Sequence, residues 1–138
     1  LGLGKLVGLL GGEHTLTLGA VQAHASAYPD LSVLYLDAHA DLRDHYLGTR
    51  YSHASVLRRI LEVCPATLVG VRSISLEEKP VLETPGLTAV VSRQLELGSA
   101  LERVLASLSP NVYVSLDLDI LDPSIMPAVG NPAPGGLG

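Results

Sequence analysis

Apolar residues occur in this chain in short runs that alternate with segments of helical period. The runs are rich in Val, Leu and Ala and predict strands at residues 5–10, 32–37, 67–71, 87–91 and 112–116. Apolar residues three or four positions apart predict helices at 15–27, 53–63 and 99–108, and more weakly at 75–82. Strands that alternate with helices are typical of an α/β domain with a mostly parallel sheet. We therefore expect one α/β domain across residues 1–138.

The same periodicity predicts which helical side chains face the core. In the first helix the apolar stripe consists of Leu16, Ala20, Ala23 and Ala27. In the second helix, which Ser52 is expected to cap, the stripe is Val56, Leu57, Ile60 and Leu61. Arg58, Arg59 and Glu62 are expected to face water or a neighbour, and His24 to be an exposed helix residue without a role.

Composition narrows the class of protein. Hydrophobic residues make up 47% of the 138, but only 4% are aromatic and none is Trp or Phe, so the core must consist of Leu, Val, Ala and Ile. The net charge of -5 argues against nucleic acid and anionic membranes as partners. No apolar run approaches the ~20 residues that span a bilayer. The single cysteine, Cys64, fits a reducing compartment, so we expect a cytoplasmic protein.

Metal-type side chains follow the strand expected at 32–37. Asp37, His39 and Asp41 occupy alternate positions, and continued extended geometry would place all three on one side. Two carboxylates and an imidazole that converge form a site for a divalent cation. The alternative is an acidic loop in which His39 is a bystander.

Two further strand ends carry residues of the same kind. Asp117 and Asp119 follow the strand at 112–116, and His14 lies at the turn before the first helix. The carboxyl ends of parallel strands form the binding crevice of open α/β sheets, although turn histidines and acidic pairs are often purely structural. Four carboxylates and two imidazoles are too many for one tetrahedral zinc and suit two hard ions such as Mn²⁺. Two such ions hold and activate a water molecule, so hydrolysis is the predicted chemistry.

Three motifs resemble those of the ureohydrolases, the arginase and agmatinase family. They are Gly11-Gly12-Glu13-His14, Asp37-Ala38-His39-Ala40-Asp41, and Ser115-Leu116-Asp117-Leu118-Asp119 with Leu121-Asp122-Pro123 after it. The resemblance implies a three-layer arginase-like fold, a homo-oligomer, two Mn²⁺ per subunit, and hydrolysis of a guanidinium group to urea and an amine. It also implies the ligands: His14, Asp37, Asp41 and Asp117 for one ion, and Asp37, His39, Asp117 and Asp119 for the other.

The loop after Asp41 indicates the subfamily. Tyr51-Ser52-His53-Ala54-Ser55 resembles the agmatinase sequence, and the arginase segment that holds the substrate's α-carboxylate is not found. The resemblance therefore implies agmatine as the substrate, putrescine and urea as products, and His53 as the catalytic residue that handles the proton of the departing amine. A solvated helix-start residue is the alternative for His53. A guanidinobutyrase-like or arginase-like hydrolase, and a non-catalytic metal-binding fragment, are the alternatives for the function.

The family fold begins before the first motif and continues past residue 138, where it supplies a glutamate that grips the guanidinium. We therefore expect this chain to be incomplete at both ends relative to that fold.

Overall fold

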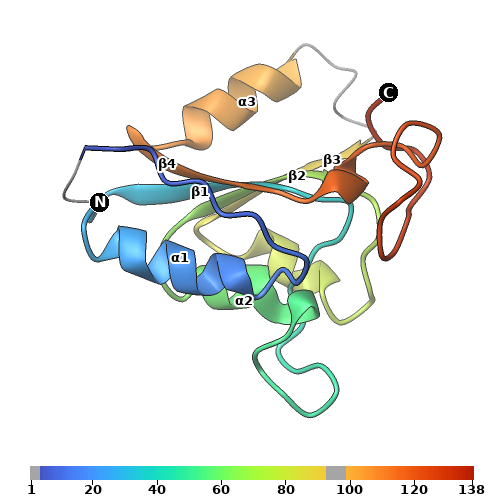
Figure 1. The fold of residues 1–138 in the computed structure, drawn as a ribbon, viewed down its shortest axis with the longest axis horizontal. Helices are drawn as coiled ribbons and strands as arrows, with labels where there is room; N and C mark the ends of the chain where they lie inside the picture. Colours follow the sequence, from blue (N-terminus) through green and yellow to red (C-terminus); the bar gives the residue numbers. More distant parts are fainter. Residues whose placement is uncertain (1–3, 93–98) are drawn as a thin grey trace.

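A four-stranded parallel sheet forms the centre of the computed structural model, which describes residues 4–92 and 99–138. The strands are β1 (Leu31–Leu36), β2 (Ala66–Val71), β3 (Leu87–Val91) and β4 (Asn111–Leu116), in the order β3-β2-β1-β4. All neighbouring strands pair in parallel, so their carboxyl ends lie at one edge of the sheet (Figure 1). Four of the five predicted strands are thus confirmed, each within one residue of its predicted start.

Helices cover both faces of this sheet. Helices α1 (Leu16–Ala25) and α2 (Val56–Ile60) pack on one face, and α3 (Ser99–Ser107) lies on the other (Figure 1). A 3₁₀ turn, η1 (His53–Ser55), precedes α2, and two more follow at η2 (Lys79–Glu83) and η4 (Leu118–Ile120). The predicted helices are therefore confirmed in place, although the weak helix at 75–82 is only a 3₁₀ turn. No helix among the described residues is long and apolar enough to cross a membrane.

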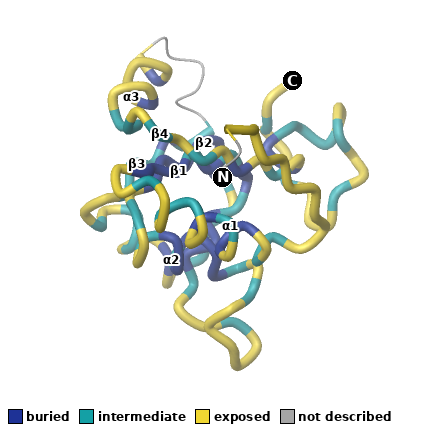
Figure 2. The backbone as a smooth tube through the Cα atoms, turned by 60° about the vertical axis from the view of Figure 1, so that its left-hand side comes forward, coloured by how far each residue is buried: buried dark blue, intermediate teal, exposed yellow. Residues whose placement is uncertain are grey.

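The core lies mainly between β1, β2 and the α1–α2 layer. Buried aliphatic side chains from both layers pack around Tyr35, which is the largest fully buried side chain. A smaller cluster that includes Val69, Val90 and Val104 lies beneath α3. Figure 2 shows that buried residues gather in the strands, whereas the residues of the peripheral loops are mostly exposed.

The strand predicted at 5–10 is wrong. The residues that the structure describes there are exposed and have no regular structure, and the side chains of Leu6 and Leu10 are fully accessible. A strand requires a partner that accepts and donates backbone hydrogen bonds. Residues 5–10 make none with the rest of the described chain, so their apolar character alone does not produce a strand.

The predicted buried face of α1 is also wrong. The buried residues are Thr17, Leu18 and Val21, whereas Leu16 and Ala23 are exposed. Small alanines give little directional preference, and Thr17 is accommodated in the interior because its hydroxyl lies 3.3 Å from the Ser115 hydroxyl.

Arg59 faces neighbouring side chains, which is one of the two alternatives expected for it, whereas His24 differs from the expectation of an exposed residue. Arg59 is buried, since its guanidinium lies 2.6 Å from Asp44 and 2.8 Å from Glu62. His24 is half-buried, because its Nδ1 lies 2.7 Å from the Ala20 carbonyl and its ring packs edge-on against Tyr113. Ser52 occupies the N-cap position of η1 as expected, but its hydroxyl lies 3.2 Å from the Ser55 hydroxyl and caps no backbone amide.

Candidate metal centre

The carboxyl ends of β1 and β4 bring two acidic segments side by side. Leu36 and Leu116 are paired at the ends of these strands, and the Asp117 amide donates to the Leu36 carbonyl. Residues 37–41 and 117–119 leave the sheet from this point. His14 reaches the same place from the turn before α1, so the parallel topology itself assembles the group.

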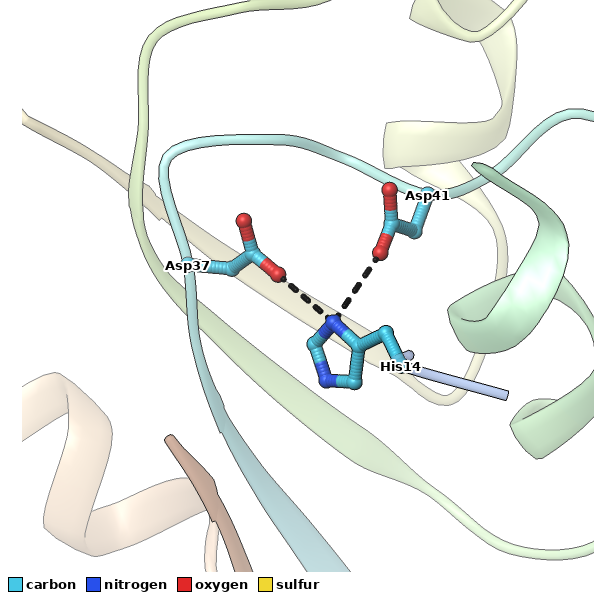
Figure 3. Close-up of side chains that lie close together, drawn as sticks. All are labelled: His14, Asp37 and Asp41. Atoms are coloured by element: carbon cyan, nitrogen blue, oxygen red, sulfur yellow. Dashed lines mark ion pairs between the residues drawn. The ribbon is translucent and has the colours of Figure 1, made fainter. Parts of the chain in front are cut away.

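One cluster forms around the His14 imidazole. Its Nδ1 lies 3.2 Å from Asp37, 3.4 Å from Asp41 and 3.5 Å from Asp117. Figure 3 shows that the carboxylates of Asp37 and Asp41 both point toward this nitrogen. His14, Asp37 and Asp41 have ligand atoms close enough to hold one metal ion.

A second cluster adjoins the first through Asp37. His39 Nδ1 lies 2.8 Å from Asp119 and 3.5 Å from the other oxygen of Asp37. Asp37, His39 and Asp119 again have ligand atoms close enough for one ion. Asp37 thus offers one carboxylate oxygen to each cluster, which is the arrangement that a pair of bridged ions requires.

Loop geometry, and not continued strand alternation, brings these side chains together. β1 ends at Leu36, and Asp41 has φ of +51°, a left-handed conformation that is uncommon for residues other than glycine. The buried Glu78 carboxylate stabilises this turn by accepting a hydrogen bond of 2.9 Å from the Leu42 amide. At β4 the Asp117 carboxylate accepts from the Asp119 amide, and the Asp119 carboxylate accepts from the Ala38 amide of the other segment. The predicted convergence is correct, but the reason given for it from sequence is not.

Burial and neighbouring charges affect the ionisation of Asp37, Asp41 and Asp117. Burial and the charge of Asp37 raise the pKa of Asp41 to about 7, and burial also raises the pKa of Asp117. Burial opposes the ionisation of Asp37, but its contacts with His14 and His39 outweigh this and lower its pKa.

The two imidazoles favour the protonated form because carboxylates surround them. Hydrogen bonds to Asp119 and Asp37 raise the pKa of His39 to about 10. Burial alone would lower the pKa of His14, but the neighbouring carboxylates raise it overall. Positive charge is therefore favoured throughout the cluster.

The donor set fits divalent cations. Asp37 Oδ2 is buried and has no hydrogen-bond partner among the described residues, although it faces the His14 imidazole. An ionised buried oxygen without a hydrogen bond is costly unless a cation neutralises it. Four carboxylates and two imidazoles suit ions that accept oxygen and nitrogen ligands, such as Mn²⁺.

A cavity of about 700 Å³ opens above this cluster. All six candidate ligands line it, together with His53 and the loop at 128–131. His53 has a side chain that is 59% exposed, lies 3.4 Å from Glu13, and packs edge-on against Tyr46. The structure therefore brings together every residue selected from the sequence, with His53 at the wall of the cavity and outside the carboxylate cluster.

Several residues that support the cluster were missed from sequence. The Ser115 hydroxyl lies 2.9 Å from His14 Nε2, and the Asn131 amide lies 3.0 Å from His39 Nε2. Each contact engages the ring nitrogen that faces away from the carboxylates. Ser115 belongs to a noted motif and could have been found, whereas Asn131 lies in a Pro/Gly-rich loop without periodicity.

Tyr35 and Arg72 were missed as well. Tyr35 reads as one more residue of a buried strand, yet its hydroxyl donates to Asp41 across 2.7 Å. Burial raises the pKa of Tyr35 well above its usual value, so this hydroxyl is a proton donor. Arg72 follows β2 and donates to the carbonyls of Asp119 and Ala133, at 2.6 and 2.7 Å, which fastens the C-terminal loop to the site.

Comparison with known proteins is consistent with this site. A family profile described as the arginase family matches residues 1–138. The chain is 43% identical over 136 residues to N(1)-aminopropylagmatine ureohydrolase of Thermus thermophilus, covering 97% of this chain and 46% of the relative. It is 40% identical over 130 residues to an agmatinase of Pyrococcus horikoshii, covering 94% and 44% respectively.

Solved structures give the same result. The agmatine ureohydrolase of Thermoplasma volcanium superposes with a TM-score of 0.79 and 37% identity, over 93% of this chain and 44% of that structure. The parallel α/β sheet with helices on both faces is therefore an arginase-like fold. The chain spans about half the length of the curated relatives that it matches.

Proposed function

The chain belongs to the arginase family, and from this premise we propose that it carries the binuclear manganese centre of a hydrolase that releases urea from a guanidino compound. The observation that supports this most strongly is the sharing of Asp37 between two potential metal-binding groups. We propose agmatine as the substrate and putrescine as the second product. We also propose that the protein is homo-oligomeric and cytoplasmic.

The six side chains around the cavity would hold the two ions. His14 and Asp41 would serve one ion, His39 and Asp119 the other, and Asp37 both. Asp117 lies 3.5 Å from His14 but belongs to neither group, and we propose it as the second shared ligand from the family resemblance. When bound, a pair of such ions activates a water molecule for attack and stabilises charge on the reacting carbon centre. Ser115 and Asn131 would fix the orientation of the two imidazoles through the nitrogens that face away from the carboxylates.

His53 is proposed to deliver a proton to the departing amine. Its position on the cavity wall leaves it free of the carboxylate cluster, and its contact with Glu13 restricts the orientation of the ring. A general acid must come within hydrogen-bond distance of the leaving group, and it must not be bound to a metal ion. An exposed side chain on the cavity wall meets this requirement.

Charge on the cavity wall supports a cationic substrate. Besides the six proposed ligands, whose carboxylates the two ions would neutralise, the carboxylates of Glu13 and Glu78 line the cavity, whereas Arg43 is the one Lys or Arg side chain among the described lining residues. A guanidinium that carries a terminal amine suits this environment, because both of its ends are cationic. The α-carboxylate of arginine would enter the same cavity with little positive charge to pair with it.

A second substrate is favoured by the relatives. The Thermus thermophilus protein that matches at 43% identity is named for N(1)-aminopropylagmatine, which has the guanidinobutyl end of agmatine with a longer polyamine tail. Both compounds would present the same guanidinium to the six ligands. They differ only in how far the cationic tail extends away from the site.

Urea release by the intact protein tests the proposal. The Mn²⁺-loaded protein is assayed on agmatine, N(1)-aminopropylagmatine, guanidinobutyrate and arginine, and kcat/KM is compared. We expect agmatine to exceed arginine by about a hundredfold or more, since an unpaired carboxylate costs several kcal/mol. Equal kcat/KM values for agmatine and arginine would contradict the assignment to the agmatinase subfamily. A higher value for N(1)-aminopropylagmatine than for agmatine would favour the second substrate. The release of no urea from any of the four compounds would contradict the proposed hydrolase activity.

A further inference from the structure

Tyr35 contacts two members of the first cluster through two different parts of its side chain. Its ring stacks on the His14 imidazole, with centroids 4.8 Å apart and planes inclined by 8°. Its hydroxyl donates to Asp41 Oδ2 across 2.7 Å and lies 3.1 Å from His14 Nδ1. One side chain from near the end of β1 therefore contacts a histidine and a carboxylate that come from separate loops.

The position of Tyr35 is unusual for a tyrosine. The side chain is fully buried among aliphatic residues of the main core, where Phe or Leu would fill the space without a polar atom. A buried hydroxyl is stable only when it has a partner, and here the partner is a carboxylate of the candidate metal centre.

The Tyr35 hydroxyl supplies the hydrogen bond that the Asp41 carboxylate accepts among the described residues. The Asp41 backbone is left-handed, with φ of +51°, and the Glu78 carboxylate holds only the amide of the following Leu42. The Tyr35 hydroxyl is what orients the Asp41 side chain from the core side. His39 and Asp119 of the second cluster bond instead with each other, with Asn131, and with the Ala38 amide.

We propose that Tyr35 is a positioning residue for one of the two ions, because its ring and hydroxyl hold His14 and Asp41 in place for that ion alone. The inference rests on the proposed function and deepens it, since it makes the two metal positions unequal in their dependence on the protein core. Outer contacts of this kind typically change metal affinity 10- to 100-fold.

The test is a titration of the metal-free intact protein with Mn²⁺. Calorimetry and electron paramagnetic resonance monitor this titration and give the binding constant of each ion. Tyr35→Phe keeps the stacked ring and removes the hydroxyl, whereas Tyr28→Phe removes a hydroxyl from a ring that packs against the same core outside the cavity. We expect Tyr35→Phe to weaken one ion 10- to 100-fold and to leave the other unchanged, and Tyr28→Phe to leave both unchanged. Two binding constants like those of the native protein in folded Tyr35→Phe would overturn the inference.

A second measurement keeps the Tyr35 hydroxyl in place, so it does not depend on whether Tyr35→Phe folds stably. With 3-fluorotyrosine introduced at position 35 alone, titration with diamagnetic Zn²⁺ should shift the fluorine resonance during the binding of one equivalent only. The same titration of labelled Asp41→Ala should show no such step. A resonance that does not respond to metal would overturn the inference, whereas a native protein that binds no pair of ions would instead refute the proposed function.

Discussion

His53 differs from the six proposed ligands in its surroundings. Its side chain is 59% exposed and faces Glu13 and Tyr46 at the wall of the cavity, whereas three of the six proposed ligands are buried and the other three are partly buried. The loss of a proton donor at this place should affect turnover without removing a ligand.

His53→Ala is therefore expected to lower kcat about 10²- to 10⁴-fold and to leave the manganese content unchanged. His45→Ala is the matched control, because His45 is a similarly exposed histidine that pairs with Asp44 outside the cavity. Turnover and metal content are measured on the same preparations. Near-normal turnover of His53→Ala would contradict the catalytic role and leave His53 as a solvated residue at the start of the helix.

The role of a single residue could be predicted from sequence where its type and spacing have few structural explanations. Asp37, His39 and Asp41 stand in a spacing that core packing does not explain, and the structure brings them together. Tyr35 and Arg59 could not be assigned in this way, because their roles depend on partners distant in sequence or on burial that periodicity does not resolve. For this reason the sequence left open whether Arg59 faces water or a neighbour, and in the structure it faces Asp44 and Glu62.

At the scale of elements, β2 and η4 approach each other closely near the site. Gly70 has φ of +91° and lies at an irregularity in the pairing of β2 with β3. A Cβ there would lie 2.7 Å from Ile120 Cγ1 and 3.4 Å from the carbonyl of Asp37. The absence of a side chain at Gly70 thus lets the Asp119 segment close over β2.

Gly70→Ala is expected to lower the free energy of unfolding by more than Gly86→Ala. Gly86 has nearly the same φ, +90°, but a Cβ there meets nothing within 4 Å, so it reports the backbone strain alone. That strain costs about 1–3 kcal/mol, and Gly70→Ala adds the displacement of Ile120. Chemical denaturation of both variants measures the difference, and equal losses would show that the contact with Ile120 relaxes freely.

Helix α1 offers the opposite case. Gly19 lies inside the helix on its exposed side, and a Cβ there meets no atom within 4 Å. Gly19→Ala should therefore raise the free energy of unfolding by about 0.5–1 kcal/mol, because alanine loses less backbone entropy in a helix. An unchanged or lowered midpoint of denaturation would mean that this surface of α1 has a role that the described contacts do not explain.

Elements were predictable from sequence where an apolar run also had a neighbour to pair with. The runs at 67–71 and 87–91 became adjacent parallel strands, whereas the run at 5–10 did not become a strand. Local hydrophobicity is the same kind of signal in all three. The distinction lies in the long-range hydrogen bonds, which a single sequence does not contain.

At the scale of the whole molecule, one face of the sheet is only partly covered. Val112, Val114 and Leu116 alternate along β4 with exposures of 38%, 56% and 58%, and β4 is an edge strand. Leu101 and Leu105 of α3 are exposed as well. An apolar face beside an unpaired strand edge favours association with other chains.

Residues 1–138 are therefore expected to associate or to be poorly soluble. Size-exclusion chromatography of this segment at several protein concentrations measures its state of association. A monodisperse 138-residue protein at all of them would contradict this expectation.

The manganese content of Asp37→Ala tests the central claim most directly. Asp37 is the one residue that belongs to both metal-binding groups among the described residues, with one carboxylate oxygen facing His14 and the other facing His39. After dialysis, the intact native protein should retain close to two Mn²⁺ per chain, and Asp37→Ala should lose both, because a shared carboxylate serves each ion. A native protein that holds a single zinc, or an Asp37→Ala variant that keeps its metal, would contradict the account.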